Sequence, residues 1–145
     1  MKTLNKNSVT VFCSLVEKMN GKQYLKIAND PFMPLTIEIV GEGIITPFGT
    51  GLQYSLCHYY TQMGDLMKDP EMCFIMVDNR NGETRAYQKV KVIPCLFQQD
   101  NAGVFEESVI LIHNRTAKYS PKLNAHHTEF ANVWLANIKA QGFLR

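Results

Sequence analysis

Apolar residues recur at helical spacing close to the N-terminus of the chain. Such spacing lines one face of an α-helix with hydrophobic side chains, and the residues in this stripe are Phe12, Leu15, Val16 and Met19. Ser8 or Asn7 offers an N-cap, and Gly21 can take the left-handed conformation that often ends a helix. The pattern predicts an amphipathic helix over residues 8–20.

Beyond this helix the pattern changes to an alternation of period two, which is typical of half-buried β-strands. It covers residues 24–28 and 35–40, and Asn29-Asp30-Pro31 between them is a turn sequence. The two segments are predicted to pair as antiparallel strands.

Four glycines at positions 41, 43, 49 and 51 predict a loop over residues 41–51, although Ile44 and Ile45 could extend the preceding strand. Residues 52–63 fit both a strand face and a helix stripe. Their aromatic side chains and the following Gly64 favour a strand.

Two further strands are predicted at residues 72–77 and 85–93. They are joined through Asn81-Gly82, a dipeptide that supplies the positive φ angles of a tight hairpin turn. Pro94 lacks the amide hydrogen that a central strand donates, so the second of these strands ends or bulges there. Another strand is expected at residues 104–113.

The C-terminal segment returns to helical spacing, with a stripe formed by His127, Phe130, Ala131, Trp134 and Ile138. Ser120-Pro121 offers an N-cap followed by proline at the first helical position, and Gly142 can end the helix. No helices separate the strands, so a parallel doubly wound sheet is not expected. The sequence predicts a single α+β domain over residues 1–145, with an antiparallel sheet of five or six strands packed against an N-terminal and a C-terminal helix.

Composition supports a real core and excludes several classes of protein. Of the 145 residues, 46% are hydrophobic and 19% are charged, which lies outside the range of disordered chains. The 15 basic and 13 acidic residues give a net charge of +2, without the dense basic patch that nucleic-acid binding favours or the acidity of a DNA mimic. We find neither a signal peptide nor an apolar run approaching the roughly 20 residues that cross a bilayer. A soluble, cytoplasmic protein without membrane contact is expected.

The four cysteines, at positions 13, 57, 73 and 95, are far apart in the sequence. They form no C-x-x-C pair and lack the spacing of a structural zinc site, and a cytosolic chain of this length does not depend on disulfides. We expect four reduced thiols packed as small hydrophobes, with no metal and no cofactor. No nucleophile motif and no phosphate-binding glycine motif occurs, so no catalytic residue is assigned.

Polar chemistry is densest between residues 58 and 71. If the flanking segments pair as a hairpin, residues 64–71 form its tip and gather three carboxylates, a ligand type that divalent cations favour. Aspartate, glycine and proline are also ordinary turn residues, and a structural turn is the favoured interpretation. The second is a binding surface, and the third is a catalytic or metal site. The candidate binding residues are His58, Tyr60, Gly64, Asp65, Asp69 and Glu71.

Two other polar pairs are weaker candidates. Glu106 and Glu107 point to opposite faces of a strand, so one could be a buried general acid, although a charged edge strand is the favoured interpretation. His126 and His127 are neighbours on a helix and do not share a face. We expect His127 in the core and His126 exposed.

Three segments of the chain resemble a family of uncharacterised bacterial proteins encoded on plasmids, conjugative transposons and related mobile elements. They are residues 31–35, 58–72 and 98–107, and the central block, HYYTQMGDLMKDPEM, is the most specific. At Met63 the family usually has asparagine, giving a Q-N-G-D turn. The resemblance implies a biological setting and a shared domain, and it implies no reaction.

Two functions are consistent with these features. The first is a non-enzymatic accessory or interaction module of a mobile element, which uses the loop at residues 64–71 and nearby tyrosines to bind a protein or nucleic-acid partner. The alternative is a small metal-assisted hydrolase, with a cation on the three carboxylates and His58 as acid or base. Converging carboxylates in a concave pocket would favour the hydrolase, and a flat exposed hairpin would favour the binding module.

Overall fold

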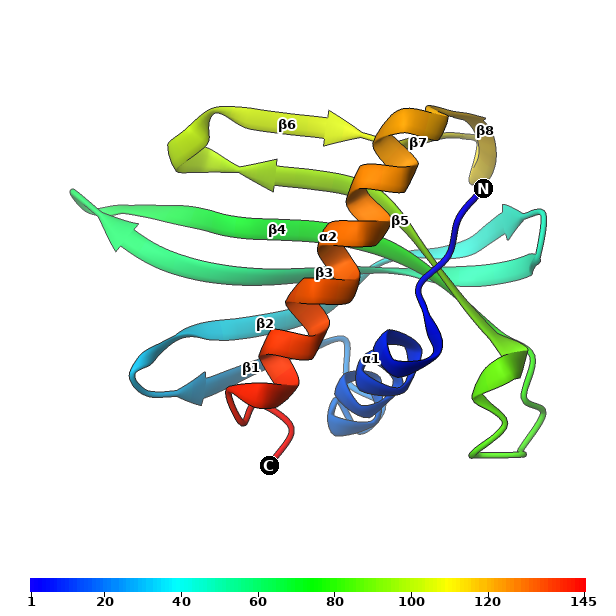
Figure 1. Cartoon of the computed structure of the whole chain (residues 1–145), viewed down its shortest axis with the longest axis horizontal. Coiled ribbons are helices and arrows are strands. Elements are labelled where there is room, and N and C mark those ends of the chain that lie inside the picture. Colours follow the sequence, from blue (N-terminus) through cyan, green and yellow to red (C-terminus); the bar gives the residue numbers. More distant parts are fainter.

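A computed structural model describes residues 1–145 as two helices on one face of an eight-stranded sheet (Figure 1). The helices are α1 (Lys6–Lys18) and α2 (Pro121–Ala140), and the strands are β1 (Tyr24–Asn29), β2 (Phe32–Thr46), β3 (Gly49–Gln62), β4 (Asp65–Asp78), β5 (Val90–Gln99), β6 (Val104–Glu107), β7 (Val109–Ile112) and β8 (Arg115–Tyr119). The strand order is β6-β5-β4-β3-β2-β8-β7, and β1 pairs with β2. Only β2 and β8 pair in parallel. The α+β class and the two terminal helices are confirmed, whereas five or six strands was too low a number.

The helix α1 begins two residues before the predicted start and ends two residues earlier. Its N-cap is Asn5, whose side-chain oxygen accepts a hydrogen bond from the Ser8 backbone N–H at 2.8 Å. Asn20 and Gly21 follow the helix with φ of 51° and 78°, as expected for the predicted stop. Neither helix has the length and hydropathy needed to span a membrane.

The predicted loop over residues 41–51 was wrong. These residues belong to β2 and β3, which form one long hairpin that turns at residues 47–48. The pairing shifts register near Gly41, where β2 bends. At Gly51 a side-chain Cβ would lie 2.5 Å from the carbonyl oxygen of Met76, so glycine lets β3 pass close to β4. Here glycine marks bends and a close approach within strands.

The connection between β4 and β5 is longer than a tight hairpin turn. Asn81 and Gly82 have the expected positive φ angles, 51° and 89°, but they lie within a loop over residues 79–89, so the predicted strand 85–93 begins only at Val90. Arg80 organises this loop. Its guanidinium donates two hydrogen bonds to the Asp78 carboxylate, at 2.9 and 2.8 Å, and one to the carbonyl oxygen of Thr84 at 2.9 Å.

The predicted strand over residues 104–113 is divided at Ser108. Its backbone N–H donates to the Cys95 carbonyl oxygen at 3.0 Å, and its hydroxyl donates to the Pro94 carbonyl oxygen at 3.2 Å. This contact separates β6, at one border of the sheet, from the β7–β8 hairpin, at the other. The prediction also missed β8. Pro94 does sit at a bulge, as predicted, and β5 continues to Gln99.

The helix α2 starts as predicted, with the Ser120 hydroxyl accepting from the Leu123 backbone N–H at 3.2 Å and Pro121 at the first position. It crosses the sheet diagonally in front of the strands (Figure 1). Four residues of the predicted stripe are buried, whereas Phe130 is 40% exposed at the edge of the helix.

Two hydrophobic clusters lie on opposite faces of the sheet. Along β4, Met72, Phe74 and Met76 belong to the larger cluster beneath the helices. The alternate residues Cys73, Ile75 and Val77 belong to a smaller cluster with Val109 of β7. The second cluster contains no residue from the far end of the β3–β4 hairpin, where Thr61 and Leu66 are exposed.

Candidate functional site

The hairpin of β3 and β4 carries most of the residues that the sequence singled out. In Figure 1 its far half extends to the left, beyond α2. The turn consists of Met63 and Gly64, with φ of 52° and 86°, the two positive angles of a type I′ turn. The predicted tip over residues 64–71 is therefore too long, because β4 already begins at Asp65.

The three carboxylates of the candidate site are spread along β4. Asp65 is exposed next to the turn, where it pairs with Gln62. Asp69 lies at a bulge of β4, opposite His58 of β3. Its Oδ1 accepts a hydrogen bond from Gln99 Nε2 at 2.6 Å. Each carboxylate has its own environment, so the strand does not gather them.

Glu71 lies on the helix-free face of the sheet, where its side chain is 12% exposed. Its Oε2 accepts a hydrogen bond from the Ser55 hydroxyl at 2.6 Å, and its Oε1 accepts one from Gln98 Nε2. The Lys68 ammonium lies 3.8 Å from Oε1. These neighbours on β3, β4 and β5 satisfy the carboxylate and hold three strands in register.

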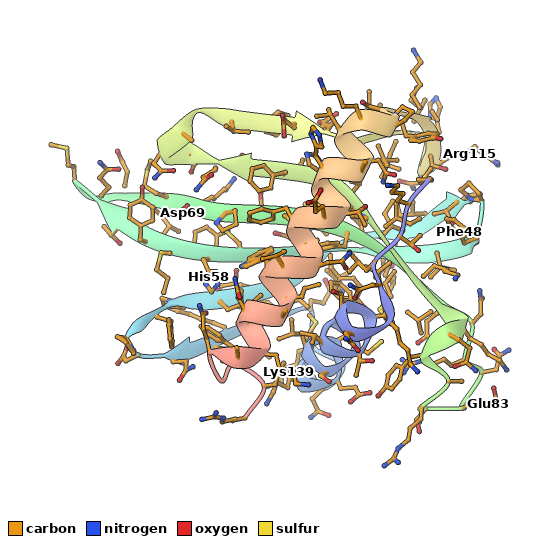
Figure 2. All side chains as sticks on the ribbon, in the orientation of Figure 1. Phe48, His58, Asp69, Glu83, Arg115 and Lys139 are labelled. Atoms are coloured by element: carbon orange, nitrogen blue, oxygen red, sulfur yellow. The ribbon has the colours of Figure 1, made fainter.

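His58 lies on the opposite face, beside α2 (Figure 2). Its ring packs against Trp134 and Phe143, with centroid distances of 5.8 and 5.5 Å. Its Nδ1 lies 3.1 Å from the Met33 carbonyl oxygen and 3.3 Å from that of Pro34, so this nitrogen carries the proton and donates. Burial disfavours the charged imidazolium and therefore lowers the pKa of His58.

The sheet therefore separates the components of the hydrolase alternative. His58 and Glu71 face opposite sides, and no group of three or more His, Cys, Asp or Glu side chains in the protein is arranged to hold a metal ion. The geometry gives no support to a cation site at this hairpin.

The tyrosines near the hairpin have different roles. Tyr54 is a core residue that packs edge-on against Phe12 at 5.5 Å between ring centroids. Tyr60, a candidate binding residue, is half-buried, and its hydroxyl donates to Gln62 Oε1 at 3.4 Å. Tyr59 is also half-buried, and both Tyr59 and Tyr60 line a cavity beside β3.

This cavity, which we call the notch, lies where the β1–β2 and β3–β4 hairpins separate. Pairing of β2 with β3 ends at Leu35 and His58, although β3 continues to Gln62 paired with β4 alone. The sequence explains the separation. The residue before Leu35 in β2 is Pro34, which has no N–H to donate to β3. The carbonyl oxygen of Pro34 already accepts a hydrogen bond from the His58 side chain.

The notch has a volume of about 480 Å³ and both apolar and polar walls. Its lining residues are Tyr24, Lys26, Met33, Pro34, Thr36, Tyr59, Tyr60, Thr61 and Leu66. Leu66 is 65% exposed, and Met63 at the adjoining turn is 97% exposed. Sequence reasoning missed this surface. Its available signal was Pro34 near the start of a strand, because a proline there prevents regular pairing with the next strand.

The cysteines pack as predicted, since all four are buried and unpaired. Burial raises the pKa of Cys13 to about 11 and that of Cys57 and Cys95 to about 12. A thiol with so high a pKa holds almost no thiolate at neutral pH, so these residues are poor nucleophiles.

The remaining candidates also have structural roles. His127 is buried and His126 is exposed, as predicted. Glu106 faces α2, where its Oε1 lies 3.1 Å from His127 Nε2, and Glu107 is exposed on the other face. The contact between Glu106 and His127 thus joins the border strand β6 to α2.

Comparison with known proteins identifies a family. No curated protein and no solved structure matches the chain. Residues 9–144, which include most of α1, all of α2 and all eight strands, match a family described as a domain of unknown function, DUF6908. The chain belongs to this DUF6908 family.

Proposed function

We propose that this protein is a non-enzymatic interaction module that binds a protein partner at the end of the β3–β4 hairpin and in the adjoining notch. The observation that carries the proposal is the combination of an open cavity with strongly exposed apolar side chains at it. Met63 and Leu66 are 97% and 65% exposed. Exposed apolar side chains around a cavity are typical of interaction sites on soluble proteins.

The charges around the notch favour a protein over a nucleic acid. Lys26 and Lys68 are accompanied by Glu38, Asp65 and Glu71 in the neighbouring strand positions. Such a mixed surface lacks the positive potential that phosphate contacts need. Tyrosine and methionine are enriched in protein interfaces, and both occur here.

The resemblance to proteins of mobile elements supplies the proposed setting, namely an accessory role in the bacterial cytoplasm, within one domain. No cofactor enters this function. We do not favour the hydrolase, because His58, Asp69 and Glu71 each have separate partners on two faces of the sheet.

Site-specific photo-crosslinking tests the proposal. A photoreactive amino acid is placed at Leu66 in the full chain, and the matched control carries it at Val133 of α2, which is comparably exposed. In lysate of the source organism, we expect a discrete protein adduct from position 66 and none of the same mass from position 133. Identical adducts from both positions, or nucleic acid as the main adduct, would contradict the proposal.

A further inference from the structure

The turn of the β3–β4 hairpin determines which backbone groups of β3 face β4. In a type I′ hairpin the residues flanking the turn, here Gln62 and Asp65, form a hydrogen-bonded pair, and hydrogen-bonded pairs alternate with non-hydrogen-bonded ones. Thr61 and Tyr59 are therefore in non-hydrogen-bonded positions relative to β4. Their backbone N–H and C=O groups point the other way, into the notch.

Beyond the Leu35–His58 pair, no residue of β2 pairs with β3, so Thr61 forms a short free edge inside the sheet, between the two hairpins. Because the backbone N–H and C=O of His58 face β4, Leu35 and His58 form a non-hydrogen-bonded pair, which directs the Tyr59 N–H at the Pro34 carbonyl oxygen and leaves only the Tyr59 C=O for a further strand. Free strand edges expose rows of unpaired donors and acceptors, which makes them templates for another extended chain. Strand addition to such an edge is a recurrent mode of peptide recognition.

The protein itself keeps this edge free. Pro34 has no N–H, and the carbonyl oxygens of Met33 and Pro34 accept from Nδ1 of His58. His58 is a residue of β3, and its side chain thus acts as a positioning group that ties the start of β2 to β3 through these carbonyl oxygens, in place of regular backbone pairing beyond Leu35. The space left between the hairpins is the cavity of about 480 Å³.

We infer that the partner contributes an extended peptide segment, which adds to the backbone N–H and C=O of Thr61 and to the C=O of Tyr59 as an extra antiparallel or parallel strand. This inference rests on the proposed function and specifies its mode. The cavity between Tyr24, Tyr59 and Leu66 receives an apolar side chain of the segment. A carboxylate on the segment pairs with Lys26, whose ammonium has no ion-pair partner within the protein.

Selection from a displayed library of random 12-residue peptides against the full chain provides the probe. Enriched peptides are synthesised, and their affinities are measured by fluorescence polarisation for the wild type, Thr61→Pro and Thr61→Val. Proline removes the N–H that faces the notch without removing a hydrogen bond to β4, and it is tolerated at such edge positions. Valine keeps the N–H and the shape of the side chain, so it is the matched control. Thermal unfolding by circular dichroism checks that both variants fold.

We expect Thr61→Pro to weaken binding up to about tenfold, as the loss of one backbone hydrogen bond implies, and Thr61→Val to bind like the wild type. N-methylation of the peptide backbone gives a second readout. Methyl groups on alternate amides should abolish binding in one register and leave it unchanged in the other, because only every second amide of an added strand faces β3.

Other outcomes separate the two proposals. If Thr61→Pro and every N-methylated peptide bind normally while Leu66→Ser loses affinity, strand addition is wrong and the hairpin remains the binding surface. If no peptide is enriched, or if enriched peptides are indifferent to both Thr61→Pro and Leu66→Ser, both proposals fail. Binding of a single-stranded DNA or RNA pool at the notch, in place of peptides, would overturn them as well.

Discussion

Met63 combines backbone strain with full exposure. Its φ of 52° lies in the left-handed region, which costs a residue other than glycine, asparagine or aspartate roughly 1–2 kcal/mol. No contact within the protein offsets this cost, since the side chain is 97% exposed. Strained residues that packing does not explain are often functional, and in this chain a methionine at the turn suits a surface that contacts a partner.

We therefore expect Met63→Asn to raise the free energy of unfolding by up to about 1 kcal/mol, because asparagine tolerates this conformation. Urea denaturation monitored by Trp134 fluorescence measures the change. Met63→Ala is the control, since alanine keeps the strain and should leave the midpoint unchanged. A lower midpoint for Met63→Asn would show that the methionine side chain stabilises the hairpin.

Trp134 is a buried core residue and Asp65 an exposed surface residue, so their substitutions should differ in their effect on stability. The indole is 7% exposed between α2 and the sheet and contacts the ring of His58. Removing such a ring costs about 3–5 kcal/mol, so Trp134→Ala should be strongly destabilised in denaturant melts followed by circular dichroism. Asp65→Ala should change stability by no more than about 0.5 kcal/mol, as exposed substitutions usually do. Equal midpoints for the two variants would contradict this division.

His58 gives the protein a pH dependence of known sign. Burial lowers its folded-state pKa below the unfolded value of 6.5, so between these two values the unfolded chain binds more protons than the folded one. This contribution to stability is complete above pH 6.5 and is lost as the pH falls through the folded pKa. Urea midpoints from pH 8 to pH 5 should therefore fall, and His58→Gln should show a smaller decline. An unchanged decline in this variant would assign the effect to other groups.

At the scale of elements, sequence patterns predicted helices better than strand ends. The caps Ser120 and Gly142, and the stop at Gly21, are local signals that act within one turn of helix, and the structure uses all three. Strand boundaries depend on neighbours far away in the sequence. Ser108 divides one predicted strand because its amide bonds to Cys95, a contact that no local pattern indicates.

The candidate site was predicted in part, for a related reason. The hairpin and its exposed turn follow from period-two alternation and from Gly64. The sequence could not show that His58 and Glu71 lie on opposite faces of the sheet. The bulge opposite His58 adds a residue to β4, which shifts the alternation of side chains between the two faces. The notch depends on the four strands β1, β2, β3 and β4 together, and only Pro34 marked it locally.

Gly51 tests the close approach of β3 and β4. A Cβ at this position would lie 2.5 Å from the carbonyl oxygen of Met76, and a backbone atom in a central strand cannot move aside easily. We expect Gly51→Ala to destabilise the protein by more than about 2 kcal/mol, in the range of overpacked cores. At Gly41 the nearest obstacle is the flexible end of the Gln53 side chain, at 2.9 Å. Gly41→Ala should therefore be mild, and similar thermal midpoints for the two variants would refute the steric explanation.

At the scale of the whole molecule, the two hydrophobic clusters share their strands. Alternate residues of β4 and β5 enter the cluster beneath the helices and the cluster on the opposite face, so one cluster cannot be lost while the other keeps its strands. The N-terminal segment is tied to the same sheet through the hydrogen bond from the Leu4 N–H to the Val92 carbonyl oxygen, at 3.0 Å. We expect both faces to unfold as one cooperative unit.

The four buried cysteines report on this cooperativity, because they sample both faces. Cys13 of α1 belongs to the cluster between the helices and the sheet, whereas Cys73 and Cys95 belong to the cluster on the opposite face of the sheet. Burial excludes reagents and raises the pKa of the thiols, to about 11 for Cys13 and about 12 for Cys95, so labelling requires opening of the surrounding structure. With Ellman's reagent at pH 8, all four thiols of the native protein should react slowly and at one common rate, and that rate should rise with urea in step with global unfolding. Single-cysteine variants assign the rates. Labelling of Cys13 more than tenfold faster than Cys95 would mean that α1 detaches while the opposite cluster stays folded, and the two faces would then be separate units.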